Sequence, residues 1–371
     1  MIYKLTQSNF ENVRPLVHAL DYHLTIQAVI DGVCPGRIYV DDAQIPKSAF
    51  IYTVEGGFLA GDAENTAFNA ALGDEIRRIA ATDDTVRPDE DALNLDVTSQ
   101  GWQAVVPTLF PDRAPLICQR RQYLCTALQV GWKALLPDGY AVQRITPAWL
   151  DQSGLDIPDH IHEWVQANWG GRAQFGQHGF GFTLVHDGQV ASWCIADCVS
   201  GDRCEIGIHT LPDHRRRGLA TVAVAATVEF CFAQGFTSVG WHCMNDNIGS
   251  WKTAEKVGFM KERDYVFHLV LFDLATHWAE TGWRAVQAQR YDAGVEAFQQ
   301  ALALKPDAPY YWRHSAAMAC AGSGHADRAL DYLRQAAEQG WPHVEFTQQC
   351  AEFTCLHESP EWQVILAMMQ H

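Results

Sequence analysis

The sequence lacks the patterns that mark metal sites and disulfide frameworks. Its 11 cysteines and 16 histidines are scattered over 371 residues, without a C-x-x-C pair or an H-E-x-x-H motif. Because such ligand sets are recognised by their spacing, we predict no metal site. Most of the cysteines lie among apolar neighbours, which is typical of reduced thiols in the core of a cytosolic protein.

Long hydrophobic runs and positive charge are also scarce. The chain has no apolar run of 18 residues and does not open on a basic segment followed by an apolar one. We therefore expect no membrane span, no signal peptide and a cytoplasmic location. Only 27 Lys and Arg residues stand against 44 Asp and Glu residues, for a formal net charge of −17. This balance argues against nucleic acid as a partner and favours cationic small molecules.

The remaining composition allows two or three folded domains. Hydrophobic residues make up 48% of the chain and charged residues 19%, which argues against disorder. A turn sequence, LPDG at 136–139, separates a first block (1–138) from a second (139–273). In the first block we predict strands within 36–42 and 48–62, helices over 9–20 and 67–81, and a solvated acidic loop over 82–96.

The second block alternates between strand and helix patterns. We predict strands at 140–145, 237–243 and 265–272, and three more within 181–211, separated by turns at Asp187-Gly188 and Gly201-Asp202. Helices are predicted over 157–169, 218–234 and 247–257. The third block, 274–371, is Ala-rich and helical. Its 34-residue period, from Trp278 to Trp312, resembles the tetratricopeptide repeat. A last helix is predicted to begin at Ser359 and Pro360.

Three arginines stand together in this acidic chain, as Arg215, Arg216 and Arg217. They lie between the strand pattern of 204–211 and a long Ala- and Val-rich helix. This order points backbone N–H groups and the positive end of the helix at one place, which favours an anion site. Gly218 lets the backbone come close to a ligand. Neither a Walker loop nor G-x-G-x-x-G occurs, and an ordinary solvated basic turn is the alternative.

A second motif lies downstream. The pattern N-x-x-S-x-x-x-x-E-K-x-G-F runs from Asn247 to Phe259. Together with EIGIHTLPDHRRRGLA at 205–220, it resembles the GNAT superfamily of acetyl-coenzyme A-dependent N-acetyltransferases. The resemblance covers 139–273. It implies an α/β domain with a mixed sheet, acetyl-coenzyme A as co-substrate and acetyl transfer to an amine.

The resemblance also implies which residues hold the coenzyme. Main-chain amides at the start of the long helix would cradle the pyrophosphate, from Arg215, Arg216, Arg217, Gly218, Leu219, Ala220 and Thr221. The preceding strand would splay from its neighbour and pair with the pantetheine arm, through Ile208, His209, Thr210 and Leu211. The amide near His209 would polarise the acetyl carbonyl. Asn247 would bond to the pantetheine, with Ser250 close by.

Proton transfer is less well defined by the motifs. An ammonium must lose a proton before it attacks a thioester. Glu205 matches a position where many relatives carry a general base; the alternatives are a solvent-facing strand residue and a partner of the substrate ammonium. The Tyr that protonates the leaving thiolate in many relatives is Ala254 here, so water is the expected proton donor. His209 and His242 are weaker substitutes and are read first as packing or surface histidines.

Two features concern the acceptor. Six aromatic side chains line either an acceptor pocket or the core: Trp164, Trp169, Phe175, Phe180, Trp193 and Trp241. The Gly-rich stretch 169–182 is predicted to be a mobile loop that covers the substrate.

The first block narrows the resemblance. With the segment 34–51, the two motifs are similar to the zwittermicin A resistance-type subfamily, in which the amino-terminal half is a GNAT-like domain without a coenzyme loop. Residues 1–138 have no R-x-x-G-x-A equivalent. We therefore predict an α/β chain of tandem GNAT-like mixed-sheet domains, 1–138 (degenerate) and 139–273 (catalytic), followed by an all-α tetratricopeptide-like region over 274–371.

The function implied is acetylation of a primary amine on a cationic small molecule, such as an aminated antibiotic. One alternative is a protein or peptide N-acetyltransferase that uses the helical tail to dock a protein partner. Another is a non-catalytic module that senses coenzyme A or binds a peptide.

Overall fold

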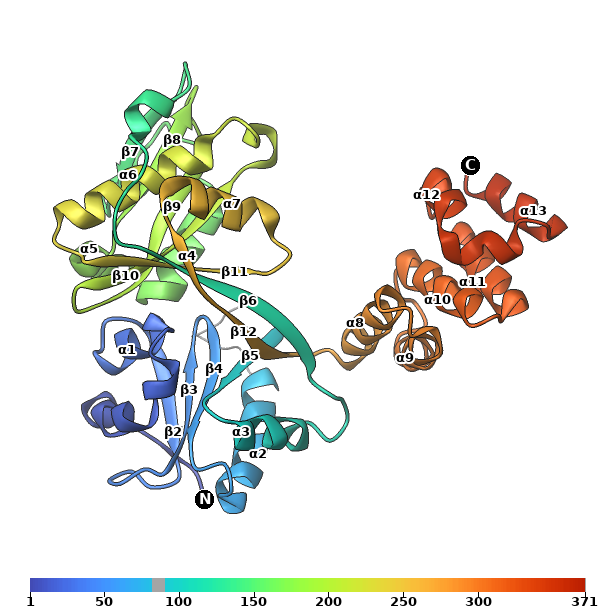
Figure 1. The fold of residues 1–371 in the computed structure, drawn as a ribbon, viewed down its shortest axis with the longest axis horizontal. Helices are drawn as coiled ribbons and strands as arrows, with labels where there is room; N and C mark the ends of the chain where they lie inside the picture. The colour runs from blue at the N-terminus through green and yellow to red at the C-terminus, as the bar shows by residue number, and fades with distance from the viewer. Residues whose placement is uncertain (82–90, 371) are drawn as a thin grey trace. The chain divides into compact units, whose positions relative to one another are not determined.

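A twelve-stranded mixed sheet runs through the first 271 residues of the computed structural model, which describes residues 1–81 and 91–370 (Figure 1). Contacts divide the chain into two units. The first combines Met1–Pro111 with Ile117–Leu269, and the second combines Asp112–Leu116 with Val270–His371. The expected boundary between 138 and 139 lies inside the first unit and stays a prediction.

The strands do not follow one another across the sheet in chain order. From edge to edge they are β1 (Tyr3–Lys4), β2 (Gly36–Val40), β3 (Ser48–Thr53), β4 (Gly56–Gly61), β5 (Ala92–Val97), β12 (Met260–Leu271), β6 (Leu116–Cys125), β11 (Ser238–Met244), β10 (Arg203–Thr210), β9 (Gln189–Ser200), β8 (Gly181–His186) and β7 (Ala141–Ile145).

Strands β6 and β12 are exchanged between the two halves of this sheet. Strand β6 comes from the first sequence block, yet it pairs antiparallel with β11 of the second. Strand β12 ends the second block and lies between β5 and β6. The buried core is continuous as well, because one cluster of apolar side chains extends from Leu5 to Phe259. Two sheets were implied by the sequence, and one continuous sheet is found.

The helices of the first unit pack on this sheet. They are α1 (Leu24–Ile30), α2 (Thr66–Ala81), α3 (Gln100–Val105), α4 (Asp159–Trp169), α5 (Arg172–His178), α6 (Leu219–Ala233) and α7 (Ile248–Val257). Helix α6 is apolar over most of its surface, and it packs against β8, β9, β10 and β11. The strands and helices predicted for 139–273 are confirmed within a few residues, including both hairpin turns.

Three local predictions were wrong or incomplete. Residues 169–182 are no mobile loop: they end α4, form α5 and begin β8, and Phe175 is fully buried. Of the predicted acidic loop, residues 92–96 belong to β5, and 82–90 lie outside the described residues. The segment 7–20 is helical, but of the 3-10 type, as η1 (Gln7–Leu16) and η2 (His18–Leu20).

The second unit is helical after the end of β12. Its helices are α8 (Leu274–Gln287), α9 (Tyr291–Leu304), α10 (Tyr310–Gly322), α11 (Ala326–Glu338), α12 (Val344–Gln349) and α13 (Pro360–Met368). Gly282 lets α8 approach α9 closely, since a Cβ there would lie 2.8 Å from the Phe298 ring. Ser359 caps α13 as predicted, accepting a hydrogen bond from the Glu361 N–H.

Two expectations from composition concern the whole chain. All of the cysteines are buried except Cys355, in agreement with the predicted core thiols. Within residues 1–81 and 91–370, no helix combines the length and apolar character needed to cross a membrane.

The buried histidine of α10 makes the second unit sensitive to acid. His314 stacks on Trp341 at a centroid distance of 4.0 Å, and its Nε2 lies 3.0 Å from the Thr347 hydroxyl. Burial, with a smaller contribution from His343, lowers the pKa of His314 from 6.5 to about 3. The folded state therefore holds this ring neutral where the unfolded chain protonates it. The contribution of His314 to the free energy of unfolding is fully present above pH 6.5 and is lost as the pH falls toward 3.

We expect the free energy of unfolding to fall by about 1.4 kcal/mol per pH unit in this range because of His314. The His314→Gln variant, which cannot take up a proton, should lose that part of the slope. Urea unfolding of the full chain, followed by helical circular dichroism at a series of pH values, measures the difference. If the free energy of unfolding depended on pH with the same slope in both proteins, His314 would not be the source of the acid sensitivity.

Candidate active site

The two central parallel strands separate at Glu205. Strands β10 and β11 are paired from Arg203 to Glu205, opposite Ser238 to Gly240. Beyond this point β10 stays paired with β9 up to Thr210. The edge of β10 that includes Ile208 is thereby left open, which is the splay predicted from the sequence. A chain-like ligand with amide groups can pair with such an edge.

The basic loop follows directly after β10. Arg216 and Gly218 have left-handed backbone conformations, with φ of 62° and 81°. A Cβ on Gly218 would meet no atom within 4 Å, so the space beside it is open. Helix α6 begins at Leu219 without a side-chain cap, and the first amides of a helix have no partner within it. The loop therefore offers free N–H groups at a positive helix end.

The side chains of two of the three arginines form hydrogen bonds within the protein. Arg215 Nε donates to the Thr210 carbonyl over 3.1 Å, and Arg217 Nη1 donates to the Tyr140 hydroxyl over 3.2 Å. Arg216 is exposed. Positive charge thus surrounds the open loop, an arrangement suited to a diphosphate.

Asn247 and Ser250 lie across the splay, at the start of α7. The Asn247 Oδ1 accepts the Ser250 N–H over 3.2 Å, and the Ser250 hydroxyl accepts the Trp241 indole N–H over 3.1 Å. Among residues 1–81 and 91–370, no hydrogen bond from the Asn247 side-chain NH₂ is seen, and the residue is exposed. The sequence placed these residues beside the splayed strand, and the fold brings them to the same cleft as Ile208.

The cleft has a volume of about 1170 Å³ and extends from the splay toward the first half of the chain. It is lined by residues of α4, β9, β10 and β11, and also by Glu55, Asn94 and Arg120. The last three come from the block 1–138, which carries no coenzyme motif. Four carboxyl groups line it, from Glu55, Glu163, Asp197 and Glu205, against the two guanidinium groups of Arg120 and Arg172. The cleft is therefore an acidic pocket.

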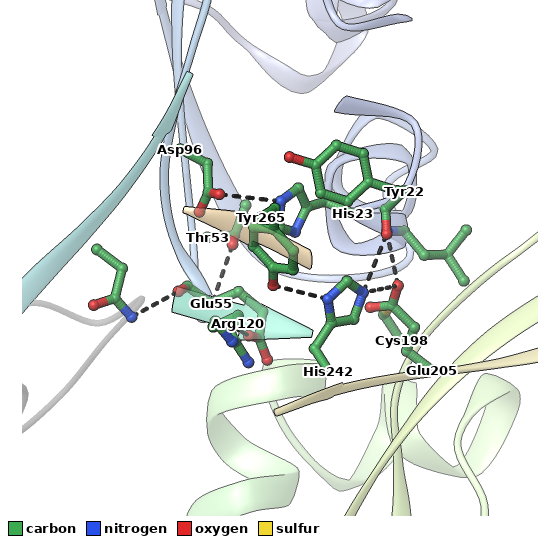
Figure 2. Close-up of polar contacts among 12 residues, drawn as sticks. Tyr22, His23, Thr53, Glu55, Asp96, Arg120, Cys198, Glu205, His242 and Tyr265 are labelled. Carbon is green, nitrogen blue, oxygen red and sulfur yellow. Dashed lines mark hydrogen bonds and ion pairs between the residues drawn. The ribbon is translucent and has the colours of Figure 1, made fainter. Parts of the chain in front are cut away.

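Glu205 lies at the point where the strands separate, and it is 8% exposed. Its Oε1 accepts the Leu24 N–H over 3.1 Å and lies 3.3 Å from His242 Nε2 (Figure 2). Gly240 makes room for it, since a Cβ there would lie 2.7 Å from the Glu205 Cγ. Burial alone would raise the pKa of Glu205, but His242, the Leu24 N–H and His23 together hold it below the ordinary value. Glu205 is thus an ionised, fixed carboxylate and not the solvent-facing residue considered from the sequence.

The contacts of His242 define its tautomer. Its Nε2 faces two acceptors, the Tyr22 carbonyl at 3.1 Å and Glu205, so this nitrogen carries the hydrogen. In the neutral ring, Nδ1 accepts from the Tyr265 hydroxyl over 2.8 Å. Figure 2 shows His242 between Tyr265 and Glu205. His242 is therefore a donor that holds the carboxylate, a role that its place in the sequence did not reveal.

A second histidine, the buried His23, packs against His242. His23 stacks on His242 at a centroid distance of 5.3 Å, and its Nε2 lies 3.3 Å from Asp96 Oδ1. Burial lowers the pKa of His23, although Asp96 opposes this shift. Asp96 belongs to the segment first taken for a solvated loop.

His209 does not reach the cleft floor. Its ring stacks on Trp193 at 4.7 Å and lies 5.4 Å from the ring of His160. Burial, together with His160 and Arg215, lowers the pKa of His209. The ring packs against Trp193, which is the packing role considered for this residue from the sequence. His209 belongs to the part of β10 beyond Glu205, which is no longer paired with β11.

Most of the six aromatic residues considered for an acceptor pocket belong to the core. Five are almost fully buried core residues: Trp169, Phe175, Phe180, Trp193 and Trp241. Trp241 nevertheless contributes to the cleft wall, as does the partly buried Trp164. Trp164 donates its indole N–H to Asp197 Oδ1 over 2.8 Å.

Comparison with known proteins decides the family. The model of the GNAT acetyltransferase family matches residues 14–268, more than half of the chain. The chain belongs to this family. It is an N-acetyltransferase, and the family implies acetyl-coenzyme A as the acetyl donor.

The relatives span both halves of the sheet. The uncharacterized N-acetyltransferase YdfB of Bacillus subtilis is 26% identical over 275 residues, covering 72% of this chain and 98% of its own. The solved GCN5-related N-acetyltransferase-like protein of Streptococcus suis has a TM-score of 0.52 at 22% identity, covering 70% of this chain and 98% of its own. A tandem GNAT protein from the clavulanic acid biosynthesis pathway has a TM-score of 0.47 at 12% identity, covering 73% and 98%.

Proposed function

We propose that this GNAT N-acetyltransferase moves the acetyl group of acetyl-coenzyme A to a primary amine of a cationic small molecule. The observation that supports this is the position of the acidic cleft, which begins where β10 leaves β11 and contains Glu55, Asp197 and Glu205. An ammonium group is attracted by such a pocket, and its walls then determine where the amine lies.

The residues of the chain fit the donor. The open loop at Arg215–Thr221 suits the diphosphate, because Gly218 leaves free space and the first amides of α6 lack partners. The free edge of β10 at Ile208–Leu211, with Asn247 and Ser250 opposite, suits the amide-containing arm. Bound in this way, acetyl-coenzyme A supplies a thioester carbonyl that an amine can attack. The amide near His209 would stabilise negative charge on that oxygen.

Glu205 holds the acceptor ammonium in this proposal. A fixed and ionised carboxylate fits the binding of an ammonium group better than proton abstraction, the role of a general base. The absence of a tyrosine at Ala254 leaves water as the proton donor to the thiolate; a thiolate leaves readily enough for this.

The narrower similarity to self-resistance enzymes of the zwittermicin A type is part of the proposal. It is supported by the cleft residues from 1–138, since Glu55 and Arg120 shape the acceptor side. The first block would then be a GNAT-like half that has kept the acceptor pocket without a coenzyme loop.

One observation favours a second candidate, a protein or peptide N-acetyltransferase. The helical unit, which we propose to be tetratricopeptide-like, has an apolar cavity of about 400 Å³ that could hold a side chain of a protein partner. The cavity is lined mainly by Trp283, Phe298, Tyr311, Trp312, Trp341 and Phe346.

The test is mass spectrometry of small amines and peptides after incubation with the full chain and acetyl-coenzyme A. We expect a mass gain of one acetyl group on polyamine-type compounds and none on peptide amino termini. Acetylated peptides alone would support the second candidate. Thermal stabilisation by acetyl-coenzyme A without any product would contradict both and favour a coenzyme sensor.

A further inference from the structure

We propose that Asp197 is the general base of the acetyl transfer and takes the proton from the ammonium that Glu205 holds. This inference rests on the proposed function, since it concerns the same cleft. Asp197 belongs to none of the motifs, and its place follows from the fold alone.

A β-bulge directs Asp197 into the cleft. On β9, Cys198 is opposite Glu205 and Ala196 is opposite Ile206, so Asp197 is an extra residue without a counterpart on β10. Bulges turn a side chain out of the regular alternation and are common beside active sites. This bulge lies at the level where β10 separates from β11, and Asp197 lines the cleft there.

The contacts of Asp197 fix one of its oxygens. Trp164 donates to Oδ1, and no hydrogen bond to Oδ2 is seen among the described residues. Gly207 is required for this arrangement: a Cβ there would lie 2.1 Å from the Trp164 ring and 3.1 Å from Oδ1. The carboxyl group is thus oriented by one donor and open to a ligand on its other side.

The electrostatic surroundings differ from those of Glu205. Burial, together with the charges of Glu55 and Glu205, raises the pKa of Asp197 well above the ordinary value, while Trp164 and Arg120 oppose the shift. The groups that face it from the neighbouring elements are Glu55, Glu205, Arg120, and the thiols of Cys34 and Cys198. Two carboxyl groups whose surroundings move their pKa values apart have different roles, and the one with the higher pKa is the better base near neutral pH.

The proton balance is simple. The Asp197 carboxylate takes one proton from the ammonium, and the freed nitrogen lone pair forms the C–N bond with the acetyl carbon. The C–S bond breaks and its electron pair stays on sulfur. The second nitrogen proton passes to that thiolate through water, and Asp197 returns its own proton to solvent through the open cleft. The products are the amide, the free thiol of coenzyme A and one proton.

Kinetics test the inference with spermidine as acceptor, or with the amine that the panel acetylates fastest. Release of the coenzyme A thiol is followed against pH. Because the base must be ionised, kcat/KM of the wild type falls on the acid side. We expect Asp197→Asn to lower kcat by about 100- to 10,000-fold and to abolish this acid limb. If Asp197→Asn kept the kcat and the acid limb of the wild type, the inference would be overturned.

Two milder variants are expected to shift the acid limb of the pH profile of kcat/KM in opposite directions. This test does not require a variant that has lost its activity. Trp164→Phe removes a hydrogen bond to the charged form, so the limb moves to higher pH. Glu55→Gln removes a repelling charge, so it moves to lower pH. The matched control is Trp149→Phe, which breaks a similar indole bond to Gln143 away from the cleft and leaves the limb in place.

A titration without any acceptor separates this inference from the proposed function. In full-length protein labelled with ¹³C in aspartate carboxyl groups, the signal missing from Asp197→Asn identifies Asp197. We expect it to titrate well above the usual value of about 3.9. Titration near that value would overturn the inference even if amines are acetylated. Failure of every amine and peptide would instead overturn the proposed function.

Discussion

Gly218→Ala is expected to weaken acetyl-coenzyme A binding at least about tenfold. The added methyl group would occupy the open space beside the loop and keep a diphosphate away from the amides of α6. It would also strain the left-handed backbone, where φ is 81°, at a cost of about 1–2 kcal/mol in stability. Isothermal titration calorimetry measures the first effect and urea unfolding the second.

Gly235→Ala is the matched control, at the other end of the same helix. Its φ is 91° and a Cβ there would also meet no atom within 4 Å. The backbone strain is therefore similar, but no ligand is proposed at that end. Equal loss of affinity in both variants would mean that strain, and not contact with the coenzyme, is responsible.

Glu205→Gln is expected to reduce kcat/KM for the acceptor amine by about 10- to 150-fold, mainly through KM. A charge-assisted hydrogen bond contributes about 1.5–3 kcal/mol, and glutamine keeps the shape and can still accept from Leu24 and His242. Steady-state kinetics with varied amine at saturating acetyl-coenzyme A measure the effect. The exposed Glu229→Gln on α6 changes net charge equally and is the control.

The same variant distinguishes ammonium binding from base catalysis. If Glu205 were the base, its loss would lower kcat and remove the acid limb of the pH profile. If it only holds the ammonium, the limb persists. It should then shift to lower pH, because one of the charges that raise the pKa of Asp197 is gone.

The strand, loop and helix that form the proposed coenzyme site could be predicted from the sequence because their determinants are local. A strand, a basic glycine loop and a helix are consecutive at 203–233, and the turns around Gly188 and Gly201 define the strands before them. Asn247 caps its own helix, so its position follows from the residues beside it.

The side of the cleft that we propose for the acceptor could not be predicted in this way. Arg120 reaches the cleft because β6 pairs with β11, and Glu55 of the β3–β4 turn forms an ion pair with it. Pairing between strands that are distant in the chain leaves no local pattern. Asp197 depends on one extra residue in β9, which periodicity does not reveal. Residues 92–96 were wrongly predicted as loop because they follow an acidic run, whereas the alternating Leu93 and Leu95 are buried in the sheet.

The exchanged strands also have a consequence for how the chain acquires its structure. Strand β12 must insert between β5 and β6, so the sheet cannot be completed until residue 271 has left the ribosome. Until then β5 and β6 have unpaired edges that expose backbone groups. Contacts between residues this far apart in the chain slow folding. The chain is therefore most prone to aggregate while only its amino-terminal half has been synthesised.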